Sequence, residues 1–185
     1  RKANSGHPGG AMSSADFIYL LFKDYLKFNP KDPSWFDRDR FILSGGHMSM
    51  LQYGILHMLG WMKLSDIKKF RQLGSQTPGH PEVEIKGVEC TTGPLGQGFA
   101  MGVGMAFAEA YLSEITKLDE EGTKLVDHYT YVLATDGDLQ EPVALGAAAI
   151  AGHLGLKKLV VYHDANDAQI SGKVSRSDSV DYATV

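Results

Sequence analysis

The sequence predicts an α/β protein in which helices flank a parallel β-sheet. Two apolar, β-branched runs at 129–134 and 158–163 enclose an alanine- and glycine-rich stretch of helical length, which is the pattern of a βαβ unit. A third buried strand is expected at 41–44. The right-handed crossover of a βαβ unit makes its strands parallel, so their carboxyl ends meet at one edge. Ligands of open α/β sheets bind outside that edge.

In the first half of the chain, a helix is expected from Ser13 or Ser14 to Phe28. Its apolar side chains recur at helical spacing (Ala15, Ile18, Tyr19, Phe22, Leu26). Asn29-Pro30 is expected to end this helix. The strand at 41–44 breaks at a glycine pair, and a helix should follow at about 48–59. Ser65 is expected to cap a short helix that runs through Phe70.

The second half begins with a long helix at about 97–116, opened by a glycine-rich loop. After the strand at 129–134, Asp136-Gly137 is typical of a turn. The next helix is expected from Glu141 to Leu154, with Glu141 in its first turn, where an anion suits the helix dipole. Its small side chains allow close packing before the last strand.

Composition fits one ordinary globular domain, 1–185, since 43% of the 185 residues are hydrophobic and 22% are charged. A net charge of −4 gives no reason to expect nucleic acid or a membrane surface as partner. Cys90 is the single cysteine, so a disulfide framework is excluded and a reduced, cytoplasmic compartment is expected. The chain opens without methionine and stops without a closing element, and we interpret it as a fragment of a longer protein.

Oxygen-bearing side chains follow the predicted strands. Asp136 ends one strand, and Asp164 and Asn166 end the other. Carboxylate and amide oxygens suit Mg²⁺ or Ca²⁺, and Mg²⁺ usually keeps phosphate oxygens among its ligands. Gly137 would let the backbone approach a diphosphate at the start of the following helix. These residues therefore fit a diphosphate held through a divalent metal, but taken alone they fit an ordinary βαβ turn equally well.

Histidines occur in three glycine- or proline-rich loops, at His7, His47 and His80. A lone histidine is more often structural, but three in one loop context favour proton transfer or hydrogen bonds to phosphates and sugar hydroxyls. The loop at 91–98 holds three glycines and a proline. It is compatible with binding of an anion or a heterocycle edge, and equally with a tight start to the long helix.

Several motifs together resemble one family, transketolase. They are Asn4-Ser5-Gly6-His7-Pro8-Gly9, Asp37-Arg38-Asp39-Arg40-Phe41, Ser44-Gly45-Gly46-His47, Thr77-Pro78-Gly79-His80-Pro81-Glu82 and Thr91-Thr92-Gly93-Pro94-Leu95-Gly96-Gln97-Gly98. Asp136-Gly137 with Asn166 resembles the Gly-Asp-Gly … Asn motif of thiamine diphosphate enzymes. The motifs come in the family's order and cover nearly the whole chain. The resemblance implies the N-terminal, diphosphate-binding domain and its fold.

The resemblance also implies roles for individual residues. Asp136, Asn166 and the main-chain carbonyl of Ala168 would ligate Mg²⁺ (or Ca²⁺), and Gly137 would meet the cofactor diphosphate. His47 and His80 would lie near the diphosphate and the reacting centre, and His7 and His80 would contact the sugar substrate. Gly93, Pro94 and Leu95 would line the ring end of the cofactor. Glu141 would lie at the subunit interface.

The implied activity is transfer of a two-carbon ketol unit from a ketose phosphate to an aldose phosphate, as in the pentose phosphate pathway. In the family a pyrimidine-binding domain, reached across a homodimer, supplies a glutamate that activates the cofactor, and arginines that hold the sugar phosphate also lie outside this stretch. The isolated chain is therefore expected to be inactive. Dihydroxyacetone synthase, deoxyxylulose phosphate synthase and a non-catalytic half that acts with a partner chain remain alternatives.

Four residues depart from the family pattern. Thr135 replaces the first glycine of the Gly-Asp-Gly motif and is expected to crowd the backbone. Asp138 and Pro142 replace more usual neighbours, and Asp138 would add negative charge near a diphosphate. Met48 stands where glycine is usual and would narrow the pocket.

Overall fold

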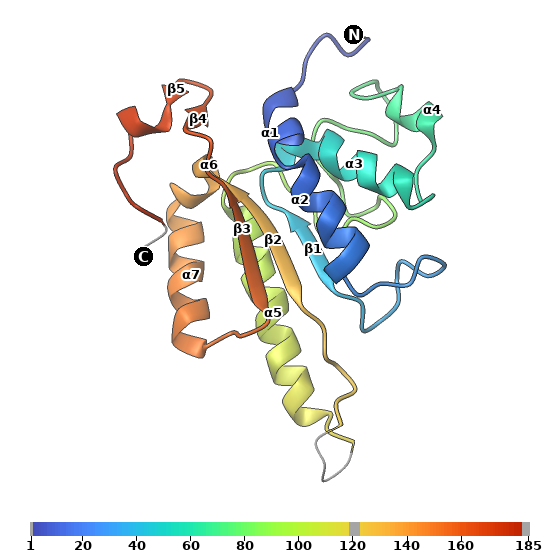
Figure 1. Ribbon diagram of the computed structural model, residues 1–185, viewed down its shortest axis with the longest axis vertical. Helices are drawn as coiled ribbons and strands as arrows, with labels where there is room; N and C mark the ends of the chain where they lie inside the picture. The colour runs from blue at the N-terminus through green and yellow to red at the C-terminus, as the bar shows by residue number, and fades with distance from the viewer. Residues whose placement is uncertain (1, 119–122, 183–185) are drawn as a thin grey trace.

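The computed structural model describes residues 2–118 and 123–182, and its centre is a parallel three-stranded sheet. The strands are β1 (Arg40–Leu43), β2 (Thr130–Thr135) and β3 (Leu159–Asp164), in the order β1-β2-β3 (Figure 1). Leu43 lies opposite Leu133, and Thr135 lies opposite Asp164. The predicted α/β fold class is confirmed, and each predicted strand is found within a residue or two of its expected bounds.

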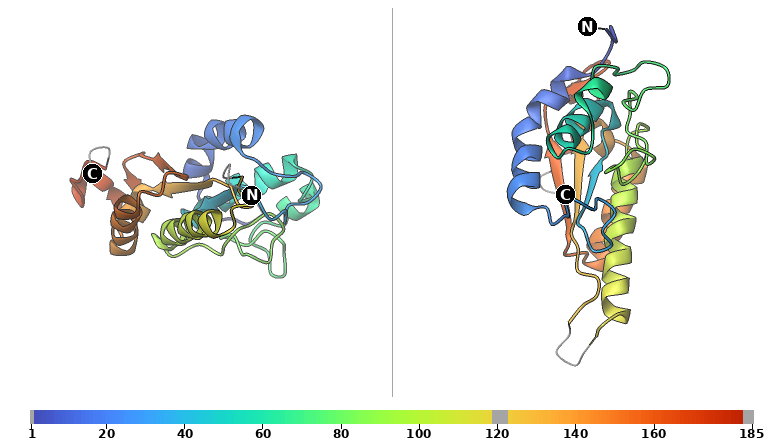
Figure 2. Two further views of the ribbon diagram at one scale, coloured as in Figure 1. Left: turned by 90° about the horizontal axis from the view of Figure 1, so that it is seen from below. Right: turned by 90° about the vertical axis from the view of Figure 1, so that its right-hand side faces the viewer.

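Helices cover both faces of this sheet (Figure 2). On one face lie α1 (Pro8–Ser13), α2 (Ala15–Leu20) and α3 (Ser49–Met58). On the other face lie α5 (Gln97–Ile115) and α7 (Pro142–Leu154). β1 and β2 are therefore buried on both sides, which explains why they read as continuous apolar runs, whereas Val160 and Val161 of the edge strand β3 stay exposed.

Strand side chains alternate between two apolar clusters, as the pleat requires. Phe41, Leu43 and Leu133 face α2 and α3, where they pack with residues such as Ile18 and Leu51. Ile42, Val132 and Ala134 face the other way and pack with α5 and α7, in a cluster that also contains Cys90, Phe99, Val103, Leu139 and Ala144. A further cluster lies beneath α3 and contains Tyr53, Leu56, Met62, Ile85 and Val88.

The first helical region differs from the single helix expected at 13–28. It comprises α1, α2 and a π-helical segment, η1 (Leu21–Tyr25). It begins earlier because Pro8 occupies the first turn, where its missing N–H costs nothing. It ends earlier because Leu26 is already extended, with ψ at 120°.

Several smaller expectations also need correction. The helix predicted from Ser65 is α4 (Leu64–Ile67), and its N-cap is Lys63. Before α3, a 3₁₀ segment, η2 (Gly46–Met48), carries His47. Asp136-Gly137 is not a turn, because it begins a short helix, α6 (Asp136–Leu139). Glu141 lies one residue before the first turn of α7, as its N-cap.

The segment after β3 contains elements that the sequence did not predict. A small antiparallel pair, β4 (Ala168–Gln169) and β5 (Gly172–Lys173), is followed by the 3₁₀ segment η3 (Val174–Arg176). Within the described ranges, every helix is too short or too polar to cross a bilayer.

Candidate active site

The carboxyl ends of all three strands open onto one edge of the sheet, at the top of Figure 1. β1 leads into Ser44 and His47, β2 into Asp136, and β3 into Asn166. The N-terminal segment and the loop between α4 and α5 lie at this same edge (Figure 1). The predicted convergence of the motif-bearing loops is therefore present.

Asp136 is the most constrained of the predicted metal ligands. Its side chain is 7% exposed. Oδ1 lies 2.8 Å from His163 Nε2, while Oδ2 accepts the backbone N–H groups of Asn166 at 3.1 Å and Asp167 at 2.9 Å. The carboxylate thus joins the end of β2 to the loop that follows β3.

Asn166 is oriented by its own neighbours. Its Nδ2 donates to Asp164 Oδ2 at 3.1 Å, so its Oδ1 is the atom left to accept, and it accepts from the Ala168 backbone N–H at 2.9 Å. Asp164 also accepts a 2.8 Å hydrogen bond from Ser13 of α1. Asp136, Asn166 and Ala168 are brought together as predicted.

These residues fit a hard cation. Two carboxylates and a carboxamide meet at the strand ends, and oxygen donors of this kind suit Mg²⁺ or Ca²⁺. Groups of three or more His, Cys, Asp or Glu side chains able to hold a metal do not occur in the described ranges, so further ligands would have to be oxygens of other kinds. A hollow of about 340 Å³ opens beside Asp136, lined also by His163, Asp167, Val174 and Tyr182.

The glycine-rich loop lies directly against the end of β1. A Cβ atom at Gly46 would lie 2.7 Å from the Gly93 nitrogen, so the two loops touch through their backbones. Leu95 reaches the other side of the edge, where a Cβ at Gly137 would lie 3.0 Å from its Cδ1. Gly93, Pro94 and Leu95 therefore form a wall between the β1 loop and α6.

The three loop histidines are neighbours. The His7 and His47 rings meet edge to face, with centroids 5.1 Å apart. A Cβ at Gly93 would lie 3.2 Å from the His80 ring, which places His80 beside the glycine-rich loop. The structure thus gathers His7, His47 and His80 at the edge that holds Asp136.

The surroundings of His47 and His80 favour neutral imidazoles. Burial, and then the nearby His7, lower the pKa of His47 below its ordinary 6.5. Partial loss of solvent, and then the Arg71 guanidinium, lower the pKa of His80. A neutral imidazole near pH 7 can accept a proton from a hydroxyl or donate a hydrogen bond to it.

Thr135 and Asp138, two departures from the family pattern, form one unit. Thr135 donates both its backbone N–H and its hydroxyl to Asp138 Oδ2, each at 2.9 Å. Asp138 Oδ1 accepts the Ser44 hydroxyl and the Gly96 backbone N–H, each at 2.8 Å. Asp138 is fully buried, and its four hydrogen bonds join the loop after β1, the glycine-rich loop and the end of β2.

Met48 and Pro142, the other two residues that depart from the family pattern, do not line the candidate site. Met48 is 1% exposed and packs in the core cluster below α1, where a Cβ at Gly10 would lie 2.8 Å from its Cγ, so it does not narrow the pocket by projecting into it. Pro142 takes the first turn of α7, which suits its missing N–H. Glu141 is half-buried and packs near Gly96; its interface role stays a prediction.

Sequence reasoning missed two side chains of the site. His163 lies outside the three histidine loops, yet its Nε2 is 2.8 Å from Asp136 Oδ1, and its place next to Asp164 at a strand end is the signal that could have revealed it. Ser44 also links two loops, because its Oγ accepts the Phe99 N–H at the start of α5 while donating to Asp138. Ser44 begins one of the family-like motifs, but nothing local in the sequence indicates its partner Asp138, 94 residues away.

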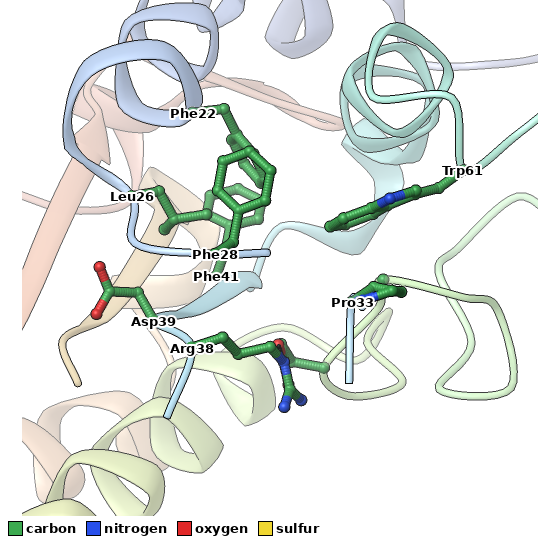
Figure 3. A pocket seen from close by; sticks show the side chains of 10 residues that line it. Phe22, Leu26, Phe28, Pro33, Arg38, Asp39, Phe41 and Trp61 are labelled. Carbon is green, nitrogen blue, oxygen red and sulfur yellow. Dashed lines mark hydrogen bonds and ion pairs between the residues drawn. The ribbon is translucent and has the colours of Figure 1, made fainter. Parts of the chain in front are cut away.

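A second hollow lies at the opposite end of β1 and does not belong to this site. Figure 3 shows Trp61, Phe28 and Phe22 around it. The rings of Phe28 and Trp61 meet edge to face with centroids 5.8 Å apart. Its volume is about 20 Å³, enough for roughly one water molecule.

Comparison with known proteins agrees with this geometry. The family described as transketolase, thiamine diphosphate binding domain, matches residues 1–184. A Staphylococcus aureus transketolase is 54% identical over 179 residues, covering 96% of this chain and 27% of the relative. A Geobacillus stearothermophilus transketolase is 50% identical over 184 residues, 98% of this chain and 27% of the relative.

Solved structures show the same fold. The transketolase from Leishmania mexicana superposes with a TM-score of 0.94 at 48% identity, covering 98% of this chain and 27% of that one. A Pichia stipitis transketolase mutant in complex with fructose 6-phosphate gives 0.93 at 44% identity, with the same coverage. The chain thus spans about a quarter of the length of the relatives it matches. It belongs to the transketolase family and corresponds to that family's thiamine diphosphate-binding domain.

Proposed function

We propose that the protein containing this chain transfers a two-carbon ketol unit from a ketose phosphate to an aldose phosphate, with thiamine diphosphate and Mg²⁺ (or Ca²⁺) as cofactors. The observation that carries this is the junction of Asp136 with the Asn166 loop beside three clustered histidines. The reaction serves the pentose phosphate pathway in the cytoplasm, with a pyrimidine-binding domain or a second subunit completing the site.

In this proposal each group of residues has a separate task. Asp136, Asn166 and the Ala168 carbonyl hold the metal, and the Gly137 backbone meets the diphosphate. Gly93, Pro94 and Leu95 line the ring end, which their contact with the β1 loop and with Gly137 supports. Glu141 faces the partner subunit.

The cofactor, when bound, carries the two-carbon unit between the two sugars. The histidines act on the sugars themselves. The imidazoles of His7 and His80 hydrogen-bond sugar hydroxyls and move protons at those oxygens. His47 lies deeper than His7 and His80, and we place it beside the diphosphate.

Titration calorimetry of thiamine diphosphate into the full-length protein, with and without Mg²⁺, tests the proposal. We expect metal-dependent binding that Asp136→Ala abolishes, because the variant loses the carboxylate that joins the two strand ends. Asp24→Ala, an exposed residue of η1, is the matched control and should bind as the wild type does. Binding that ignores the metal, or that survives Asp136→Ala, would contradict the proposed site.

A further inference from the structure

Arg71 lies between two of the histidine loops. It belongs to the connection between α4 and α5, at the same edge as the N-terminal segment (Figure 1). Its Nη1 donates to Ser5 Oγ at 3.1 Å, in the loop that carries His7. A Cβ atom at Gly79 would lie 2.9 Å from its Nε, in the loop that carries His80. The guanidinium is thus held beside both histidines expected at the sugar.

No carboxylate neutralises this guanidinium. Among residues 2–118 and 123–182, Arg71 takes part in no salt bridge, and its buried Nε has no hydrogen-bond partner. Arg38 shows the contrast, because its Nη2 lies 2.7 Å from Glu89. The charge of Arg71 reaches His80 and helps to lower the pKa of that ring.

Arg71 is half-buried, lies among imidazoles and has no carboxylate partner for its charge within the described residues. Such a guanidinium is available to form an ion pair with a bound anion. Its contacts with Ser5 and with the Phe70 ring, at 5.4 Å, orient the side chain without cancelling its charge. An incoming anion would supply the missing partner. The planar fork of guanidinium suits phosphate oxygens, with which it forms strong, charge-assisted hydrogen bonds.

We propose that Arg71 binds the phosphate group of the sugar substrate and thereby favours phosphorylated over unphosphorylated sugars. This rests on the proposed function, which places a sugar at His7 and His80. The resemblance assigns other phosphate-binding arginines to parts of the protein beyond this stretch, and Arg71 adds a cation from the diphosphate-binding domain itself. Arg71 would affect which sugar is preferred as substrate, whereas cofactor binding would depend on Asp136 and its neighbours.

Steady-state kinetics of the full-length enzyme test this, with a ketose phosphate and the corresponding free ketose as donors. Losing a charged hydrogen bond predicts that Arg71→Gln raises KM for the ketose phosphate about tenfold to a hundredfold. The kcat/KM for the free ketose should fall by much less, about threefold at most. Arg71→Lys keeps the charge without the fork, so its effect should be smaller and in the same direction.

Lys69→Gln is the matched control, because it removes the same charge from an exposed side chain two residues away. It should leave the donor preference unchanged. Calorimetric titration of thiamine diphosphate verifies that each variant retains its fold; if Arg71→Gln does not, the donor preference of Arg71→Lys decides.

Two kinetic results would overturn the inference. Equal losses with both donors would show that Arg71 only braces the two loops, and unchanged kinetics would show that it has no part in binding. Failure of the wild type to transfer a ketol unit from either donor is a distinct result. It would overturn the proposed function itself, and this inference with it.

Discussion

Asp138 illustrates how a single buried carboxylate can hold a site together. It accepts four hydrogen bonds, from Ser44, Gly96 and twice from Thr135, and no solvent reaches it. Asp138→Ala would leave several buried donors unpaired, and each costs about 1–3 kcal/mol. We expect the free energy of unfolding to fall by at least about 3 kcal/mol, measured by chemical denaturation of the full-length protein.

Asp138→Asn refines this prediction. An amide keeps one acceptor for Ser44 and Gly96 but turns an NH₂ group toward the Thr135 N–H. Its loss of stability should be smaller than that of the alanine variant. Asp16→Ala, at an exposed position of α2, should change stability by no more than about 0.5 kcal/mol. A stable Asp138→Ala protein would show that the loops hold their places without this carboxylate.

His163 should tune the affinity of the proposed metal site through its contact with Asp136. Partners of a ligating carboxylate typically change metal affinity about tenfold to a hundredfold when they are removed. His163→Phe keeps a planar ring but loses the 2.8 Å bond to Oδ1. We expect weaker Mg²⁺ binding in calorimetric titrations at saturating thiamine diphosphate, with His153→Phe, on an exposed face of α7, as the control. Equal Mg²⁺ affinities in wild type and His163→Phe would assign the histidine to packing alone.

At the level of single residues, the sequence predicted which motif-bearing groups would meet at one edge of the sheet, while their roles remain predictions. Asp136, Asn166 and the three loop histidines are of this kind. Asp138 and Ser44 were not predicted as a pair, because they meet across 94 residues of chain. Arg71 is similar, since its neighbour Ser5 lies 66 residues away. Such partnerships depend on how loops are packed, which no local pattern records.

Among the elements, α5 depends on its small residues for its distance from the sheet. A Cβ at Gly102 would lie 2.4 Å from Val132 Cγ2, whereas a Cβ at Gly104 meets nothing within 4 Å. Gly102→Ala should therefore lower the free energy of unfolding by about 1–3 kcal/mol through overpacking. Gly104→Ala should raise it by about 0.5–1 kcal/mol, because alanine favours the helix.

Chemical denaturation of the Gly102→Ala and Gly104→Ala variants measures these opposite changes in the free energy of unfolding. The contrast controls for the change from glycine to alanine, since both positions lie in one helix. If Gly102→Ala were as stable as Gly104→Ala, the close contact between α5 and β2 would not limit the packing.

Helices and strands with a regular pattern of apolar residues were predicted well. Short segments whose ends depend on capping or on a break in the backbone were not. The strands and α5 follow from apolar runs and a long helical pattern. The break between α2 and η1 does not, because the buried side chains Ile18, Leu21 and Phe22 continue across it. Thr135 and Asp138 convert an apparent Asp-Gly turn into α6, since the pair forms a capping box.

For the whole molecule, parallel strands made the site predictable. Once β1, β2 and β3 run in one direction, their following loops must share an edge, and each motif falls on such a loop. The tail after β3 was not predicted, because its two short strands and η3 carry too few residues to show a period.

The histidines give the molecule a dependence on pH that belongs to the fold as a whole. Burial lowers the pKa of His47 and of His128, and His80 shifts the same way. Below the ordinary histidine pKa of 6.5, the unfolded chain therefore binds more protons than the folded one. The contribution of these histidines to the free energy of unfolding should be fully present above pH 6.5. It should be lost as the pH falls from 6.5 toward their lowered pKa values in the folded state.

His128 offers the cleanest test, because it lies far from the proposed cofactor ligands and is 5% exposed beside Arg40. The thermal unfolding midpoint of the full-length protein should fall between pH 7.5 and pH 5.5, and His128→Gln should reduce that fall, since glutamine cannot take up the proton. His57→Gln is a suitable comparison, because that ring bonds the Met62 carbonyl in a different cluster. A variant whose midpoint falls as steeply as that of the wild type would show that other groups govern acid sensitivity in this range.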